Sequence, residues 1–252
     1  MRILLVASAF NSLTQRVQAE LGDRGHQPAF VLAAGDPDAR DDALRAAVRA
    51  HRPDLLLAPM LTSAVPQDVW SAVPTLIVHP GPLGDRGPSS LDWALHEGAQ
   101  RWGVTVLQAT GEMDGGDVWA TAGCDLPAAG KSDLYRNEVS DAALDAVLLA
   151  VERFASGVHR PLPQPRGAVV RRPYFRQELR RVDWSADTTA AVLRKLRAAD
   201  SRPGVLDRLL GEDWYLHGGH PEGALTGPPG ELLATRAGAV CRATVDGAVW
   251  IP

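Results

Sequence analysis

Short apolar runs alternate with amphipathic helical patterns through the first 80 residues, and this alternation limits the possible folds more than any other feature. The apolar runs lie at 2–9, 28–34, 53–60 and 74–80. Runs that are apolar on both faces are typical of parallel strands covered by helices on both sides. Helical patterns lie at 12–26, 36–52 and 68–73. The sequence therefore predicts an α/β fold with an open, mostly parallel, Rossmann-like sheet.

The rest of the chain predicts a second, smaller domain. Helices are expected at 90–102, 131–157 and 186–200, and strands at 103–110 and 117–126. Prolines and arginines crowd residues 158–184, as in a basic linker. Short β-like runs alternate with glycine-rich turns from Trp214 to Pro252, as in a small β-barrel. We expect a catalytic domain at 1–165, a basic linker and helix at 166–200, and a small β domain at 201–252.

Composition and missing motifs exclude several function classes. A net charge of −4 gives no general attraction for nucleic acid or an anionic membrane, and no apolar run approaches the ~20 residues of a membrane span. Two cysteines form no disulfide framework, which predicts a cytoplasmic protein. The seven histidines lack metal-ligand spacing, and neither G-x-G-x-x-G nor a Walker A motif occurs. After these exclusions, the sequence favours metal-free acid–base chemistry at the ligand site of an α/β sheet.

One histidine stands where such chemistry is expected. Ligands of open α/β sheets bind beyond the carboxyl ends of the strands, and His79 ends the fourth predicted strand. Asp114 follows 35 residues later, on a turn between two strands expected beside that of His79. A carboxylate near an imidazole orients it and stabilises its protonated form. We therefore interpret His79 and Asp114 as a candidate acid–base pair. A lone histidine is also often structural.

Three segments resemble the 10-formyltetrahydrofolate-dependent formyltransferase family, to which methionyl-tRNA formyltransferase belongs. They read "IVHPGPLGDRGPSSLDWAL", "GVTVLQATGEMDGGDVWA" and "VDWSADTTAAVLRKLRAAD". His79 and Asp114 match the family's catalytic histidine and aspartate. The resemblance implies a formyltransferase domain followed by an OB-like barrel, and 10-formyltetrahydrofolate as co-substrate. It implies folate-binding roles for Met60, Leu61, Ser63, Arg86, Gly87 and Gly115.

Ile77 departs from the family pattern, which has an asparagine two residues before the histidine. Isoleucine offers no donor for an oxyanion. One branch of the family, the amino-terminal modules of hydrogenase maturation factors, resembles this chain in the departure and in "RPYFRQELR". The branch implies formyl transfer to coenzyme A, giving formyl-CoA as precursor of the carbon monoxide ligand of nickel–iron hydrogenase. It also implies a linked or separate enoyl-CoA-hydratase-like module, expected to begin where this chain ends.

The arginines of the basic linker suggest a site for the phosphates of coenzyme A. Guanidinium groups suit phosphate recognition. The arginines are Arg166, Arg171, Arg172, Arg176, Arg180 and Arg181. The candidate ligands are Arg172, Tyr174, Arg176 and Arg180. Two alternatives stay open: a freestanding N-formyltransferase acting on a small amine, amino-sugar or hydroxyornithine, and a folate-binding module with little turnover. A transfer RNA acceptor is disfavoured by the acidic net charge.

Overall fold

The computed structural model describes residues 1–164, 167 and 169–252, which form two compact units. The first unit comprises 1–87, 101–125 and 136–172, and the second comprises 88–100, 126–135 and 173–252. The expected domain boundary at 165/166 and the linker residue Arg166 lie outside the described residues. The domain limits at 1–165, 166–200 and 201–252 stay predictions.

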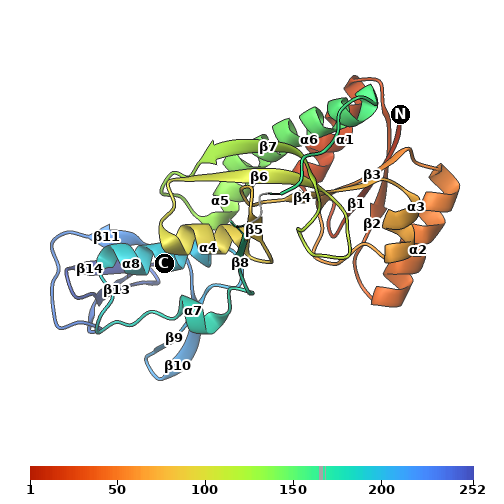
Figure 1. The fold of residues 1–252 in the computed structure, drawn as a ribbon. Helices are drawn as coiled ribbons and strands as arrows, with labels where there is room; N and C mark the ends of the chain where they lie inside the picture. The colour runs from red at the N-terminus through yellow and green to blue at the C-terminus, as the bar shows by residue number, and fades with distance from the viewer. Residues whose placement is uncertain (165–166, 168) are drawn as a thin grey trace. The chain divides into compact units, whose positions relative to one another are not determined.

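A six-stranded sheet forms the centre of the first unit, in the order β2-β1-β3-β4-β6-β7 (Figure 1). The first four strands in the chain run parallel to one another: β1 (Arg2–Ala7), β2 (Gln27–Leu32), β3 (Leu55–Met60) and β4 (Thr75–His79). The last two, β6 (Arg101–Gln108) and β7 (Val118–Asp125), are antiparallel. The prediction of an open, mostly parallel α/β sheet is confirmed.

Helices bury both faces of this sheet, which explains why β3, and β1 from Ile3 onward, are apolar. On one face Leu44 of α2 (Pro37–His51) and Val69 of α3 (Gln67–Ala72) pack into one cluster with Leu4 of β1. Helices α1 (Ser12–Asp23) and α6 (Glu138–Ser156) lie together on the other face (Figure 1). Asp36 caps α2 by accepting from the backbone N–H groups of Asp38 and Ala39.

Two predicted helices differ from the structure more than the others do. The helix expected at 90–102 ends earlier, as α4 (Ser90–Glu97), because Gly98 adopts a left-handed conformation with φ +72° and closes it. The helix expected at 131–157 is divided into α5 (Lys131–Arg136) and α6 by Asn137, whose φ of −109° and ψ of −94° are not helical. Both errors concern helix ends, where local backbone geometry overrides the apolar repeat.

The second unit contains small antiparallel sheets, as the predicted β-rich carboxyl-terminal region requires. A hairpin is formed by β9 (Val205–Leu209) and β10 (Glu212–Leu216). A four-stranded sheet has the order β11 (His220–Glu222), β14 (Ala248–Ile251), β13 (Ala239–Ala243) and β12 (Leu232–Arg236). Helix α7 (Gln177–Arg180) precedes α8 (Thr189–Ala198), whose Val192 and Leu196 pack against Val205 and Val249. Among the described residues, no helix is long and apolar enough to cross a membrane.

Candidate active site

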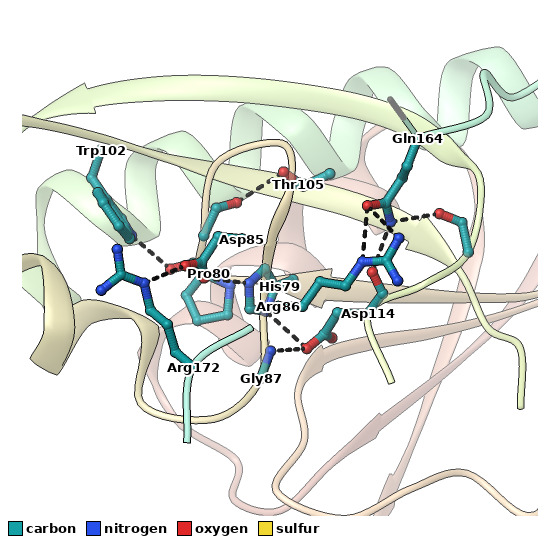
Figure 2. A network of polar contacts seen from close by, with 12 residues as sticks. His79, Pro80, Asp85, Arg86, Gly87, Trp102, Thr105, Asp114, Gln164 and Arg172 are labelled. Atoms are coloured by element: carbon teal, nitrogen blue, oxygen red, sulfur yellow. Dashed lines mark hydrogen bonds and ion pairs between the residues drawn. The ribbon is translucent and has the colours of Figure 1, made fainter. Parts of the chain in front are cut away.

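His79 is the last residue of β4 and is only 5% exposed. Its strand pairs with β6, where His79 lies opposite Thr105, and β6 leads into the turn that carries Asp114. The structure therefore brings the two predicted catalytic side chains together, with His79 Nδ1 3.6 Å from Asp114 Oδ2 (Figure 2). This distance is longer than a hydrogen bond.

A second carboxylate, Asp85, lies on the other side of the imidazole. Its Oδ2 is 2.9 Å from His79 Nε2, and its Oδ1 accepts a hydrogen bond of 3.1 Å from Arg172 Nε (Figure 2). The Asp85 side chain is 4% exposed. Asp85 was not predicted as a site residue, although it is the only acid in the loop between His79 and α4. That loop was already singled out by His79, so a carboxylate within it was a usable signal.

The loop after His79 is held at several points. Thr105 Oγ1 donates to the carbonyl of Gly81 at 2.8 Å, and Trp102 Nε1 donates to the carbonyl of Pro80 at 3.0 Å (Figure 2). A Cβ atom at Gly81 would overlap both His79 Nε2 and Asp85 Oδ2. Glycine is therefore required at this position for the imidazole and the carboxylate to meet.

A short parallel ladder ties the same loop to a distant part of the chain. Strand β5 (Asp85–Arg86) pairs with β8 (Val170–Arg171). The backbone N–H groups of Val170 and Arg172 donate to the carbonyls of Gly84 and Arg86, both at 2.9 Å. This ladder places Arg172 beside Asp85, across 87 residues of sequence.

The turn that carries Asp114 is anchored through its carboxylate and its backbone. Asp114 Oδ2 accepts a hydrogen bond of 2.9 Å from the N–H of Gly87, and Asp114 itself adopts φ +50°. Aspartate tolerates this left-handed conformation better than most side chains. Gly87 has φ +107°, and a Cβ there would overlap the carbonyl oxygen of Arg172. Gly115 lies against the Glu112 side chain, which a Cβ at Gly115 would displace.

Arg86 and Gln164 bridge the loop to this turn. Arg86 is 9% exposed, and its Nη1 lies 2.9 Å from Glu112 Oε1. Gln164 accepts from the Arg86 guanidinium at 3.2 and 3.3 Å and donates to the carbonyls of Asp114 and Gly116 at 2.7 and 2.9 Å (Figure 2). Gln164 was missed because nothing in its local sequence marks it.

Glu112 lies on the outer side of the site and is ionised there. A hydrogen bond from Arg171, and beyond it the positive charge of Arg86, lower the pKa of this carboxyl from its ordinary value. Its side chain is 47% exposed, so solvent screens much of the attraction.

The predicted folate-binding residues at the end of β3 and just after it lie at the carboxyl edge of the sheet. Met60 ends β3, and its carbonyl accepts from the N–H of Ser8 at the end of β1. Leu61 and Ile77 both pack against the apolar cluster that contains Leu4, and Ser63 follows two residues after Leu61. Their folate-binding roles, like those of Arg86, Gly87 and Gly115, stay predictions.

The predicted coenzyme A ligands fall in both units. Arg172 belongs to the first unit, where it holds Asp85. Tyr174 and Arg176 belong to the second unit and are exposed. Arg180 also belongs to the second unit but is 4% exposed, with its Nη2 2.5 Å from Asp92 Oδ1. No described group of three or more histidine, cysteine, aspartate or glutamate side chains could hold a metal ion.

Comparison with protein families gives two matches. Residues 3–151 match the formyl transferase domain, and residues 175–252 match the formyl transferase C-terminal domain. The chain is 48% identical over 254 residues to the hydrogenase maturation factor HoxX of Bradyrhizobium diazoefficiens. The match covers all of this chain and 44% of HoxX, so the chain spans less than half the length of that relative.

Solved structures extend the comparison. The crystal structure of HypX from Aquifex aeolicus in complex with tetrahydrofolic acid is 46% identical, with a TM-score of 0.91 over all of this chain and 43% of that one. The methionyl-tRNA formyltransferase of Clostridium thermocellum is 13% identical, with a TM-score of 0.70 over 88% of this chain and 94% of that one. The second likeness concerns the fold alone.

Proposed function

The chain belongs to the formyl transferase family, and we propose that it transfers the formyl group of 10-formyltetrahydrofolate to coenzyme A. The observation that carries the proposal is the buried His79, which ends a central strand between two carboxylates at the carboxyl edge of the sheet. An imidazole can act as a general acid and a general base toward a bound substrate. The likeness to a HypX structure solved with tetrahydrofolic acid supports the folate as the formyl donor.

The chemistry requires a proton to move between acceptor and donor. The thiol sulfur of coenzyme A attacks the formyl carbon, forming a C–S bond and a tetrahedral oxyanion. Collapse of this intermediate breaks the C–N10 bond of the folate, and the thiol proton ends on N10. His79 accepts the proton from the thiol and returns it to the leaving nitrogen, and the protonated imidazole stabilises the oxyanion.

Ile77 supports a thiol acceptor. Its side chain joins an apolar cluster and has no hydrogen-bond donor for the oxyanion. A thiol with a pKa of about 8.5 loses its proton more readily than an amine with a pKa of about 10.4. A site with one fewer oxyanion donor therefore suits a thiol better than an amine.

Folate binding is proposed for the carboxyl ends of β3 and β4. Met60, Leu61 and Ser63 would contact the pterin, with the apolar surface of Leu61 and Ile77 suited to its rings. Arg86, Gly87 and Gly115 would border the formyl group through the loop and the turn that hold Asp114.

Coenzyme A binding is proposed for the segment around residues 172–180. Tyr174 and Arg176 are exposed and so available to an adenine ring and a phosphate. Arg172 and Arg180 already pair with Asp85 and Asp92, so they would support this segment through those pairs. We expect Arg176→Ala to raise the KM for coenzyme A without changing that for the folate. Arg236→Ala, on the exposed end of β12, is the matched control and should change neither.

Formyl-CoA would then pass to an enoyl-CoA-hydratase-like module that releases carbon monoxide for the nickel–iron site of hydrogenase. One relative, the hydrogenase maturation factor HoxX, supports this place in hydrogenase maturation by its name. This chain covers 44% of HoxX, which leaves room in that protein for a further module.

The direct test incubates the purified chain with 10-formyltetrahydrofolate, with and without coenzyme A. We expect tetrahydrofolate and formyl-CoA in equal amounts, and no tetrahydrofolate without an acceptor, measured by absorbance and mass spectrometry. Formylation of an amino-sugar or hydroxyornithine in preference to coenzyme A would identify an N-formyltransferase. Folate binding without turnover would identify a binding module. Either result would refute the proposal.

A further inference from the structure

The two ring nitrogens of His79 face carboxylates at different distances. Nε2 lies 2.9 Å from Asp85 Oδ2, within hydrogen-bond range, and Nδ1 lies 3.6 Å from Asp114 Oδ2, outside it. A neutral imidazole carries one hydrogen, on one of these nitrogens. The geometry therefore raises the question of which nitrogen keeps that hydrogen and which one reacts.

Asp85 is held as an ionised acceptor. Its Oδ1 accepts from Arg172 Nε at 3.1 Å, and arginine keeps its charge at every pH at which proteins work. The Asp85 side chain is 4% exposed, so water competes little for its oxygens. An ionised carboxylate can only accept a hydrogen bond, and its partner at 2.9 Å must therefore donate.

We infer that Asp85 is a positioning residue, which fixes the hydrogen of His79 on Nε2 and leaves Nδ1 as the nitrogen that exchanges protons with the substrates. The role of Nδ1 as the reacting nitrogen rests on the proposed function. The position of the hydrogen on Nε2 rests on the contacts alone. Asp114 then lies on the reacting side of the ring. Its side chain is 12% exposed, against 4% for Asp85, and the N–H of Gly87 holds the oxygen that faces Nδ1.

The two carboxylates consequently act at different stages. Asp85 orients the ring before the reaction, as the buried aspartate of a serine protease triad does for its histidine. Once Nδ1 takes up a proton, the imidazolium lies between both carboxylates, and Asp114 stabilises the new N–H. Arg172 is a cation that contacts Asp85, and the buried Arg86 pairs with Glu112 of the Asp114 turn.

Substituting Asp85→Asn gives a sharp test because an amide has one acceptor and one donor end. Arg172 Nε–H still requires an acceptor, so the amide oxygen turns to Arg172 and the NH₂ turns to His79 Nε2. The hydrogen of His79 is then forced onto Nδ1. We expect kcat to fall on the order of 10³-fold with the KM for the folate unchanged, since the substitution removes no folate contact.

Nitrogen-15 NMR of the histidine ring measures the tautomer directly, with the His79 signals assigned by their loss in His79→Gln. We expect the Nε2–H form in the unmodified chain and in Asp114→Asn, and the Nδ1–H form in Asp85→Asn. An Nδ1–H form in the unmodified chain, or unchanged kcat and tautomer in Asp85→Asn, would overturn the inference. The spectrum of the unmodified chain decides the matter even where Asp85→Asn fails to fold. It also does so where no formyl transfer is found, which separates this inference from the proposed function.

Discussion

Two buried aspartates of this chain, Asp85 and Asp92, share one kind of partner and differ in the second. Each is paired with an arginine, Asp85 with Arg172 at 3.1 Å and Asp92 with Arg180 at 2.5 Å. The second partner of Asp92 is Lys131 at 3.0 Å. The second partner of Asp85 is His79, whose ring nitrogens can each donate or accept a hydrogen bond, whereas a lysine ammonium only donates. A buried Asp–Arg pair alone therefore does not mark a functional site.

The backbone around the two aspartates differs as well. Asp92 lies within helix α4 of the second unit. The pKa of the nearby Tyr135 hydroxyl is raised, mainly because the hydroxyl is buried and also because of the negative charge of Asp92. Asp85 lies on a two-residue strand inside a loop of the first unit. Helices and sheets supply rigid support, whereas loops at strand ends present side chains to ligands. The comparison indicates that the Asp92–Arg180 pair is structural and that the Asp85–Arg172 pair serves the site.

The largest expected effect follows from removing the imidazole, the partner that distinguishes Asp85 from Asp92. His79→Gln should slow formyl transfer by about 10³-fold, within the usual range for loss of a general acid–base group. The Asp85–Arg172 pair is kept, so thermal unfolding should change little. Initial rates of tetrahydrofolate release measure the first effect. His51→Gln, at the exposed end of α2, is the control, and an equal loss there would remove the special role of His79.

Asp92→Asn should lower the stability of the chain, whereas His79→Gln should slow the reaction. Removing the carboxylate charge leaves the buried guanidinium of Arg180 and the half-buried ammonium of Lys131 without their counterion, which costs about 3 kcal/mol of unfolding free energy. Urea titration measures this loss, and Asp213→Asn on exposed β10 should show almost none. The tautomer of His79 should be unchanged in both variants. A changed tautomer in Asp92→Asn would contradict the distinction between the two aspartates.

Gly81→Ala tests the contact between His79 and Asp85 by steric overlap. The added methyl group would overlap His79 Nε2 and Asp85 Oδ2, and overpacking of this kind costs about 1–3 kcal/mol. We expect lower stability together with a lower kcat, because the imidazole must move away from Asp85. Gly111→Ala, where a Cβ meets no atom within 4 Å, is the matched control. Equal behaviour of the two variants would show that the pair tolerates displacement.

We expect the smallest change in stability at Glu112, whose side chain is about half exposed. Its pKa is below the ordinary value of 4.5 because of the hydrogen bond from Arg171, so its ionised form contributes stability above pH 4.5. Glu112→Gln should be slightly less stable than the unmodified chain at pH 7. The difference should vanish as the pH falls below 4.5 through the lower pKa of the folded state. Paired urea titrations across this range measure it, and a difference that grows on acidification would refute the assignment.

The apolar periodicity of the chain was sufficient to predict the sheet and the strand that His79 ends. Short apolar runs that alternate with helical patterns can be recognised in local stretches of sequence. It also placed Asp114 on a turn next to that strand. The motifs around His79 and Asp114 identified the family, which the comparisons confirm.

Only the tertiary structure decided which groups meet at the imidazole. Asp85 contacts His79 because the loop folds back over Gly81, and Arg172 reaches Asp85 through the β5–β8 ladder from 87 residues away. The same structure showed that Arg180, one of a run of similar arginines, is buried against Asp92. Local patterns record which face of an element is buried. They carry no record of which distant side chain completes a buried pair, because that depends on how the elements pack.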